Sequence, residues 1–394
     1  KLGIEIPIND VFDFPTIAQL TERLGIQENK STLQGIKTGE PRPEFIPLSY
    51  SQERLWFINE LEGSLQYHIP TVLRLKGNLN VEALEYALNQ ITNRHEVLRT
   101  LIKEKEGQGY QFVQKKDGWK LTRIDGNEFE NDPDGLRKYV QELICFPFDL
   151  SKDYMLRAEL ITLDNSEHLL VVTMHHIASD AWSRSVIVKE VIEFYDSYLE
   201  KREAKLEPLQ FQYADFAVWQ RNYLQGNTLE KKLEYWKNKL AENESLALPT
   251  DFRRPAARSI EGASESFRLD SDIAGKLNKL GKDNGSTLFM TLITAFKILL
   301  YRYTGQKDIT VGTSITKRPQ QELENLIGFF VNTLALYDEV SSENSFKELL
   351  KRVRQTTLEA YDHQDVPFEK VVDAVVTDRD PSRSPVFQAL LVLN

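Results

Sequence analysis

The sequence predicts an α/β fold of two lobes, each a mixed β-sheet covered by helices. The chain has 394 residues, which exceeds one ordinary hydrophobic core and suffices for two. Its content of 41% hydrophobic and 27% charged residues is typical of a soluble globular protein. Strand-like runs rich in branched and aromatic residues alternate with amphipathic helical patterns in both halves of the chain. We therefore expect two helix-covered sheets.

The composition argues against several classes of function. The net charge is −10 and no basic stripe is present, so we expect no binding to nucleic acid. The longest apolar stretches, residues 169–174 and 288–300, are too short or too interrupted to span a bilayer, and no signal-peptide pattern opens the chain, so we expect no membrane association. The single cysteine, Cys145, allows no intrachain disulfide, which is typical of a reducing cytoplasm. We also expect no metal site.

The first part of the chain divides into a short helix and a linker. Residues 13–24 are predicted to be helical, with Pro15 in the first turn and three apolar residues at helical spacing. Residues 28–45 are polar, contain glycine and proline, and lack periodicity, as linkers do. Globular structure is expected from residue 46.

The first lobe is predicted from one helix and a set of strands. Residues 81–95 place Leu84, Leu88 and Ile91 on one face, which is the pattern of an amphipathic helix that covers a sheet. Branched and aromatic residues predict strands over residues 72–75, 110–113, 155–161 and 168–174.

A second helix is predicted directly after the last of these strands. Either Ser179 or Asp180 can cap its first turn, and the helix runs to about residue 199 with its apolar face inward. The adjacent histidines His175 and His176 therefore lie where a buried strand passes into a helix.

The second lobe shows the same alternation after a helical region at residues 219–236. Residues 286–303 are predicted to form a helix that is buried on most of its surface. Residues 308–313 and 326–336 are predicted strands, and residues 346–361 a further amphipathic helix. No sequence repeat relates the two lobes.

The histidine pair is the first candidate for chemistry. His176 places a titratable base at the mouth of a buried strand, and Asp180 follows four residues later, which is an arrangement that acyl or proton transfer requires. A lone histidine at a strand end is more often a structural residue. The interpretation therefore depends on other segments of the chain.

Seven separated segments resemble the condensation domains of nonribosomal peptide synthetases, which belong to the chloramphenicol-acetyltransferase-like acyltransferases. The segments are SYSQERLW from Ser49, RHEVLRT from Arg94, HHIASDAWS from His175, YADFAVWQ from Tyr213, IGFFVNT from Ile327, HQDVPFE from His363 and SRSPVFQ from Ser382. Their order and spacing make chance agreement implausible. The resemblance runs from about Pro47 to the last residue.

The resemblance implies two chloramphenicol-acetyltransferase-like lobes that form a pseudo-dimer with a tunnel between them. The N-terminal lobe is expected over residues 46–215 and the C-terminal lobe over residues 216–394. The family continues beyond the segment SPVFQALLVLN, so we expect the second lobe to be truncated. The stretch VFDFPTIAQL resembles the final helices of a peptidyl carrier protein. Residues 1–25 are therefore expected to be the end of a carrier and residues 26–45 the linker.

The resemblance also implies an activity. Condensation domains join two thioester-held acyl groups, because the amine of an acceptor aminoacyl group attacks the thioester carbonyl of the donor. Both groups ride on phosphopantetheine arms supplied by an upstream donor and a downstream acceptor carrier domain, so we expect no cofactor bound covalently to this chain. An adenylation domain is the expected neighbour, and the opening segment SYSQERLW is similar to that of domains with an L-configured donor and acceptor. A catalytically impaired carrier-binding platform and an acyltransferase for free coenzyme A are the alternatives.

The resemblance assigns His176 to the acceptor amine, either as general base or as a group that orients it. Adjacent residues on a strand point to opposite faces, so His175 is expected inward in a structural role. We also expect a salt bridge between Asp180 and Arg318 of the other lobe, which would hold the turn that presents His176.

The residues after Asp180 are the remaining candidates. Ala181 stands where the family has glycine, which would allow a positive φ or a close approach to the thioester. Ala181, Trp182, Ser183 and Asn332 are candidates for lining the tunnel or contacting pantetheine, although helix capping explains Ser183 equally well.

Overall fold

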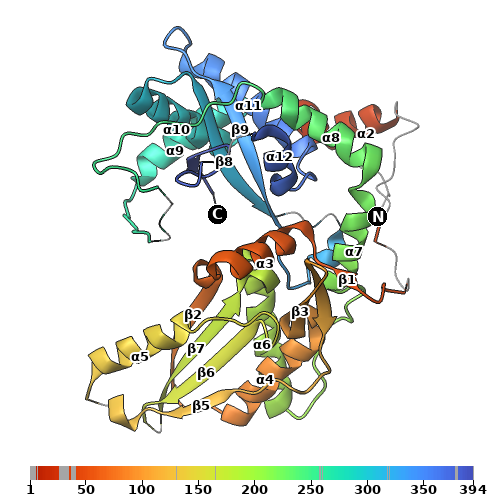
Figure 1. The fold of residues 1–394 in the computed structure, drawn as a ribbon, viewed down its shortest axis with the longest axis vertical. Helices are drawn as coiled ribbons and strands as arrows, with labels where there is room; N and C mark the ends of the chain where they lie inside the picture. Colours follow the sequence, from red (N-terminus) through yellow and green to blue (C-terminus); the bar gives the residue numbers. More distant parts are fainter. Residues whose placement is uncertain are drawn as a thin grey trace. The chain divides into compact units, whose positions relative to one another are not determined.

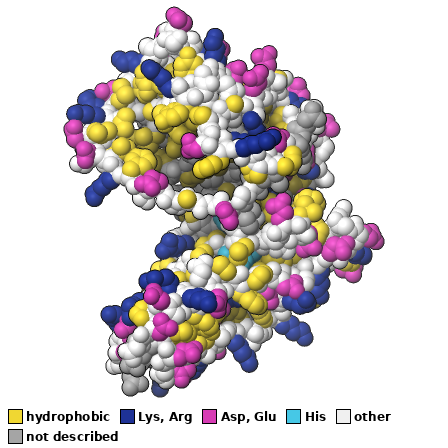
Figure 2. All heavy atoms as spheres, turned by 60° about the vertical axis from the view of Figure 1, so that its left-hand side comes forward, with side chains coloured by type: hydrophobic (Ala, Val, Ile, Leu, Met, Phe, Trp, Pro, Cys, Tyr) yellow, Lys and Arg dark blue, Asp and Glu magenta, His cyan; other side chains and the backbone are white. Residues whose placement is uncertain are grey.

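The computed structural model describes residues 6, 8–25, 35–36, 41–129, 131–164, 166–256, 259, 261–316, 318, 320–377 and 380–393. The chain divides into two compact units. The histidine unit consists of Ile36–Tyr223 and Thr316–Val331, and the terminal unit consists of Lys1–Gly35, Leu224–Ile315 and Asn332–Asn394. Charged side chains of both signs are interspersed over the face shown in Figure 2.

These units differ from the predicted division at residues 215 and 216, because Thr316–Val331 returns to the first unit. Leu323, Leu326, Ile327 and Phe330 of this segment are buried in the hydrophobic core of the histidine unit. The expectation that Arg318 belongs to the other lobe is corrected accordingly. Burial of four large apolar side chains places this returning segment with the first unit.

The histidine unit is built on a four-stranded mixed sheet (Figure 1). Its strand order is β2 (His68–Lys76), β7 (Glu167–His175), β6 (Leu156–Thr162) and β5 (Thr122–Asp125). The pairs β2–β7 and β6–β7 are antiparallel, whereas β5–β6 is parallel. A smaller sheet pairs β1 (Ile46–Pro47), β4 (Gln108–Val113) and β3 (Thr100–Lys105). The predicted α/β class is confirmed. Strands β2, β4 and β7 extend beyond their predicted limits, and β6 is shifted by one residue.

The helices of the histidine unit cover this sheet or flank it. The predicted amphipathic helix is α4 (Val81–Arg94), capped by Asn80, and it packs on α6 (Ala181–Leu199). Leu84, Leu88 and Ile91 lie in the core, as their spacing predicts. The other helices of the unit are α3 (Tyr50–Glu62), α5 (Pro133–Cys145) and α7 (Tyr213–Tyr223).

The terminal unit contains a three-stranded sheet in the order β10 (Ala389–Leu390), β8 (Asp308–Thr316) and β9 (Val331–Glu339). Its helices are α8 (Gly226–Lys239), α9 (Ser271–Asp283), α10 (Leu288–Thr304), α11 (Phe346–Asp362) and α12 (Phe368–Val375). Its core joins Ile293 and Leu300 of α10 to apolar residues of β8, β9 and α11. Strand β9 begins five residues after the predicted start, because residues 326–330 form a loop in the histidine unit.

Two regions predicted to be helical are each divided between two helices in the structure. The region 219–236 breaks between α7 and α8, where Gly226 has a φ of 55° that glycine tolerates and other residues avoid. The predicted helix 13–24 is replaced by α1 (Ile8–Asp13) and α2 (Ile17–Gly25). Pro15 disfavours a helical conformation at the residue before it, and the Thr16 hydroxyl accepts a hydrogen bond from the Gln19 amide at 3.3 Å to begin α2.

Part of the predicted linker, residues 26–34 and 37–40, lies outside the described residues. None of the helices in the described ranges is both long and apolar enough to cross a membrane.

Candidate active site

The histidine pair lies where β7 ends and α6 is about to begin. His175 is the last residue of β7, and His176 opens a single 3₁₀ turn, His176–Ala178, that leads to the N-cap of α6. His175 is fully buried and His176 is half-buried. The turn therefore separates one enclosed imidazole from one that reaches the surface.

Both ring nitrogens of His175 make hydrogen bonds inside the unit. Nδ1 accepts from the Ile177 amide at 3.1 Å, so the neutral ring carries its proton on Nε2, which lies 2.8 Å from Ser64 Oγ. Ser64 in turn donates to Asn59 Oδ1 at 2.6 Å. Burial, together with positive charge from neighbouring groups, lowers the pKa of His175 to about 3. A neutral His175 thus holds the turn from within.

His176 has different surroundings. Its ring centroid lies 4.7 Å from that of Phe329, with the planes inclined by 63°. Among the described residues, Nδ1 is buried and has no hydrogen-bond partner, whereas Nε2 is not among the buried unpartnered atoms. The Gln52 side chain of α3 donates to the Ile177 carbonyl at 3.2 Å and braces the turn. The arrangement leaves Nε2 as the ring nitrogen available to a reactant.

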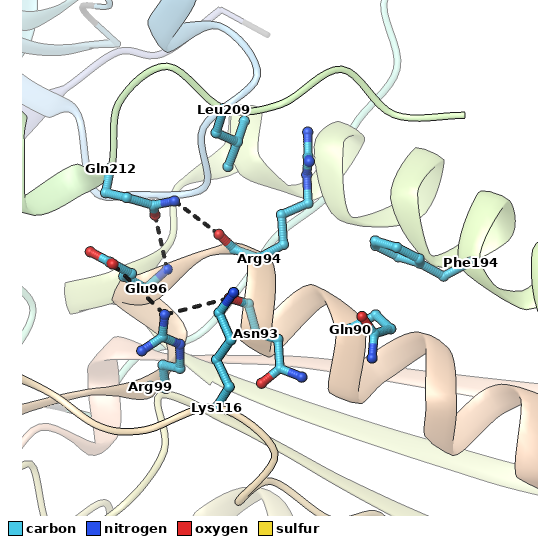
Figure 3. A pocket seen from close by; sticks show the side chains of 9 residues that line it. All are labelled: Gln90, Asn93, Arg94, Glu96, Arg99, Lys116, Phe194, Leu209 and Gln212. Carbon is cyan, nitrogen blue, oxygen red and sulfur yellow. Dashed lines mark hydrogen bonds and ion pairs between the residues drawn. The ribbon is translucent and has the colours of Figure 1, made fainter. Parts of the chain in front are cut away.

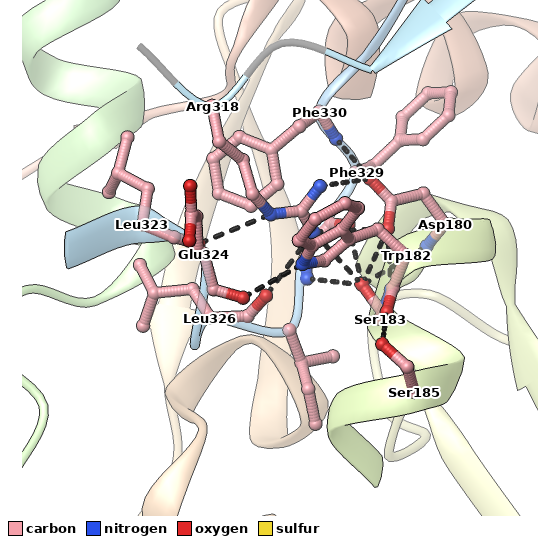
Figure 4. Close-up of polar contacts among 12 residues, drawn as sticks. Asp180, Trp182, Ser183, Ser185, Arg318, Leu323, Glu324, Leu326, Phe329 and Phe330 are labelled. Carbon is pink, nitrogen blue, oxygen red and sulfur yellow. Dashed lines mark hydrogen bonds and ion pairs between the residues drawn. The ribbon is translucent and has the colours of Figure 1, made fainter. Parts of the chain in front are cut away.

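Asp180 and Arg318 form a buried two-pronged ion pair (Figure 4). Each terminal guanidinium nitrogen donates to one carboxylate oxygen at 3.1 Å, and the side chains are 4% exposed for Arg318 and 0% exposed for Asp180. Arg318 Nε also donates to the Leu323 carbonyl at 3.1 Å. Paired hydrogen bonds of this kind fix direction as well as distance.

The same carboxylate caps α6 and holds a loop. Asp180, rather than Ser179, is the N-cap, and it accepts hydrogen bonds from the Ser183 amide at 2.9 Å and the Ser183 hydroxyl at 2.7 Å. It also accepts from the Phe330 amide at 3.2 Å. Within the described residues no hydrogen bond joins Asp180 to His176. Asp180 therefore organises the backbone around the histidine without a hydrogen bond to its ring.

The candidates that follow Asp180 are placed in three different ways. Ser183 is fully buried, and besides capping α6 it accepts from the Gly328 amide at 3.1 Å, so its hydroxyl is used within the fold. Trp182 is 47% exposed and donates from its indole to the Glu324 carbonyl at 2.8 Å. Ala181 is exposed at the first position of α6 and has no positive φ.

Asn332, the fourth candidate, lies in the terminal unit and bridges two segments there. Its amide nitrogen donates to the carbonyls of Gln364 at 2.9 Å and Val366 at 2.7 Å, and its oxygen accepts from the Phe368 amide at 3.0 Å. The side chain fastens β9 to the start of α12. These bonds occupy the polar atoms of Asn332 with backbone groups.

The sequence patterns did not single out the residues that hold the loop beside His176. The Tyr213 hydroxyl donates to the Phe329 carbonyl at 2.6 Å and lies 2.8 Å from Ser49 Oγ. A Cβ at Gly328 would overlap the Tyr213 ring, so only glycine fits there. These residues belong to the segments SYSQERLW, YADFAVWQ and IGFFVNT, which was the available signal.

A buried histidine from the segment RHEVLRT fixes the same loop. His95 Nε2 lies 2.8 Å from Glu190 Oε2, and Nδ1 accepts from the Ile327 amide at 3.3 Å. Burial lowers the pKa of His95, so it is neutral and donates to the carboxylate. Although burial opposes it, the hydrogen bond from His95 and the nearby charge of Arg94 leave the pKa of Glu190 below its usual value.

A polar cavity of about 360 Å³ in the histidine unit contains none of the predicted site residues (Figure 3). Gln212 spans part of it, accepting from the Glu96 amide at 3.0 Å and donating to the Arg94 carbonyl at 3.0 Å. These bonds commit the amide group of Gln212 to the backbone of the cavity wall. In the part of the chain that the structure describes, no three His, Cys, Asp or Glu side chains are grouped as a metal site requires.

The fold and the histidine turn define the family. Residues 43–394 match the model of the condensation-domain family, and the chain belongs to that family. It is 42% identical over 398 residues to a component of the linear gramicidin synthase of Brevibacillus parabrevis, and 37% identical over 393 residues to the malpinin synthetase of Mortierella alpina. Each alignment covers 99% of this chain but only 5% of the relative.

Solved structures agree with the assignment. The complex of the X-domain and OxyB from teicoplanin biosynthesis has a chain that is 30% identical, with a TM-score of 0.83 over 92% of this chain and 80% of that one. A four-domain nonribosomal peptide synthetase bound to AMP and glycine matches with a TM-score of 0.78, over 94% of this chain and 28% of that one. At 22% identity, this second likeness concerns the fold alone.

Proposed function

We propose that this chain catalyses amide-bond formation between a donor acyl or peptidyl thioester and the amine of an acceptor aminoacyl thioester. The observation that carries the proposal is His176, a half-buried imidazole with one available nitrogen on a turn braced by Asp180 and Arg318. Membership of the condensation-domain family supports the two thioesters as the substrates that this imidazole would meet.

The surroundings of His176 favour orientation of the amine over full proton abstraction. A histidine that becomes an imidazolium is stabilised by a carboxylate beside its other ring nitrogen, which offsets the new positive charge, as the aspartate of a Ser-His-Asp triad does. In the described residues Nδ1 of His176 has no such acceptor, and Asp180 is committed to Arg318 and the helix cap. We infer that Nε2 accepts a hydrogen bond from the attacking amine. This bond directs the lone pair of the amine toward the thioester carbonyl.

Holding the two reactants supplies the rest of the rate. An amine and a thioester that arrive on separate tethers react faster when both are ordered at attack distance, because the entropic cost is met by binding. The proposed partners are upstream donor and downstream acceptor carrier domains, which supply the two phosphopantetheine arms, and a neighbouring adenylation domain. An L-configured donor and acceptor remain the proposed substrate type.

The relatives support placement of the chain in such an assembly. Their alignments cover 99% of the chain, including residues ahead of position 43 where the family model begins. We propose that α1 and α2 are the end of an upstream carrier domain, and that the protein acts in the cytoplasm.

Replacement of His176 by alanine tests the function. We expect the rate of peptide transfer between loaded carriers to fall by about a hundredfold or more, with the thermal unfolding midpoint unchanged, because a general acid–base or orienting group is lost. His168→Gln, on strand β7 ahead of the turn, is the control and should transfer at the wild-type rate. Transfer by His176→Ala at the wild-type rate would remove this residue from the mechanism.

A second candidate function is a platform that binds partner proteins without transfer. One observation favours it, namely the likeness to the X-domain solved in complex with OxyB. Incubation with donor- and acceptor-loaded carriers distinguishes the two functions by mass spectrometry. A platform binds the carriers and leaves both thioesters intact, whereas an amide-forming domain moves the donor group onto the acceptor. An arm with soluble acyl-coenzyme A tests the acyltransferase alternative.

A further inference from the structure

We infer that Phe329 is the positioning residue of His176, and that its aromatic ring sets the direction in which the imidazole presents Nε2. The inference rests on the proposed function of His176. It adds a residue that acts through the histidine and does not itself touch the reacting atoms.

His176 differs from His175 and His95, two buried histidines of the same unit. His175 has both ring nitrogens in hydrogen bonds, to Ser64 and Ile177, and His95 likewise to Glu190 and Ile327. Neither ring nitrogen of His176 makes a hydrogen bond to the described residues, and Nδ1 is buried. Its orientation must therefore come from packing, and its ring contact is with Phe329 at 4.7 Å and 63°. Edge-to-face contacts of this kind have a preferred geometry.

The backbone of Phe329 is fixed on both sides by buried groups. Before it, the Gly328 amide donates to Ser183 Oγ at 3.1 Å, and after it the Phe330 amide donates to Asp180 at 3.2 Å. Its own carbonyl accepts from the Tyr213 hydroxyl at 2.6 Å. A side chain on a backbone held in this way has few orientations left, which is what a positioning group requires.

Phe329 is less buried than an ordinary core residue. Its neighbour Phe330 is buried, and its ring packs against Tyr213 and Phe216 at centroid distances of 5.0 and 4.8 Å. Phe329 is only half-buried. Phe330 lies inside the core, whereas Phe329 packs at the edge of that core and its ring contacts His176. The ion pair between Asp180 and Arg318, which we call the clamp, acts on the histidine through this loop.

The test compares Phe329→Ala, Phe329→Leu and Phe329→Tyr in the 394-residue chain, with Phe112→Ala, an exposed phenylalanine on β4, as the matched control. We expect kcat for carrier-to-carrier transfer to fall about ten- to hundredfold in the alanine and leucine variants, with KM for the acceptor carrier unchanged. Phe329→Tyr keeps the aromatic edge and should recover most of the rate. Phe112→Ala should resemble the wild type.

A spectroscopic readout is independent of activity. The chain has six histidines, so labelling them with ¹³C gives a resolvable set of ring resonances, and the His176 signal is assigned by its loss in His176→Ala. We expect Phe329→Ala to shift this signal and leave that of His168 in place, because only His176 loses a neighbouring ring.

The outcomes separate the two proposals. Wild-type protein that transfers nothing contradicts the proposed function, whatever the variants do. Active wild-type protein with an equally active Phe329→Ala variant, or an unshifted His176 signal, contradicts the positioning role. A rise in KM at constant kcat also contradicts it, since Phe329 would then bind substrate.

Discussion

Each unit of the molecule contains a buried ion pair between a basic side chain and an aspartate, and the two pairs do different things. In the histidine unit, Asp180 and Arg318 join a helix cap to a loop. In the terminal unit, Lys297 of α10 pairs with Asp338 of β9 and donates to the Leu336 carbonyl at 2.6 Å. The first pair holds irregular backbone beside a half-exposed histidine, whereas the second ties regular elements together. Both pairs bury charge, so burial alone does not indicate a functional role. The indication comes from the kind of backbone that each pair holds, irregular in the first case and regular in the second.

The second pair illustrates how burial acts on a charged group. Lys297 is fully buried, and desolvation lowers its pKa even though Asp338 opposes the shift. The Thr356 hydroxyl donates to the other oxygen of Asp338 at 2.6 Å, so the pair is surrounded by partners from α10, α11 and β9. A network of this kind favours one packing of the elements over others.

The largest effect is expected when each pair loses its cation. Arg318→Met leaves Asp180 buried and unpaired, and Lys297→Met does the same to Asp338, so each variant should lose about 3–5 kcal/mol in its free energy of unfolding. Peptide transfer per folded molecule should fall at least tenfold in Arg318→Met, because the loop beside His176 is released. It should stay at the wild-type level in Lys297→Met.

Chemical denaturation and carrier-to-carrier transfer, both measured at low temperature, give the two quantities. If the folded fraction of Lys297→Met is as inactive as that of Arg318→Met, the distinction between the two pairs is wrong. The spectroscopic signal of His176 provides an independent check, since it should move only in the Arg318 variant.

Several elements of regular structure were predictable because their patterns are local. The spacing of Leu84, Leu88 and Ile91 gave the buried face of α4, and the run before His175 gave β7. The loop at residues 326–330 was not predictable, since its apolar residues have the composition of a strand. What makes it a loop is burial against the histidine unit, together with hydrogen bonds to Asp180 and Ser183.

The site was predictable only in part, for a related reason. Family resemblance paired Asp180 with Arg318, and the structure brings them together across 138 positions of sequence. Ser183 and Asn332 had no local pattern that separated a ligand contact from a structural bond. Their partners, Gly328 and the backbone of residues 364–368, are distant in sequence and became known from the fold.

A smaller effect is expected from His175, which stabilises the same turn as a neutral ring. Its pKa of about 3 in the folded protein lies below the unfolded value of about 6.5, so the unfolded chain binds the proton first as the pH falls. The stabilisation is complete above pH 6.5 and is lost toward pH 3, at no more than about 1.4 kcal/mol per pH unit.

Unfolding of the wild type and His175→Gln, followed from pH 7 to pH 4, measures this contribution. The variant should be less stable at pH 7, and its stability should fall less steeply with acid, because the titrating group is gone. Equal slopes for the two proteins would show that folding does not lower the pKa of His175. The result also shows how far the stability of the turn depends on groups other than Asp180.

The smallest effect is expected at Ala181, directly after the aspartate of the clamp. Ala181 is exposed, occupies the first position of α6, and has no positive φ, so the backbone there does not require glycine. Ala181→Gly should cost no more than about 1 kcal/mol of stability, because glycine only loosens the first turn of the helix. The transfer rate should change less than twofold if the clamp alone determines the shape of the turn. A much larger gain in rate would mean that the methyl group obstructs an incoming thioester, and the contact between this helix start and the substrate would then be as important as the clamp behind it.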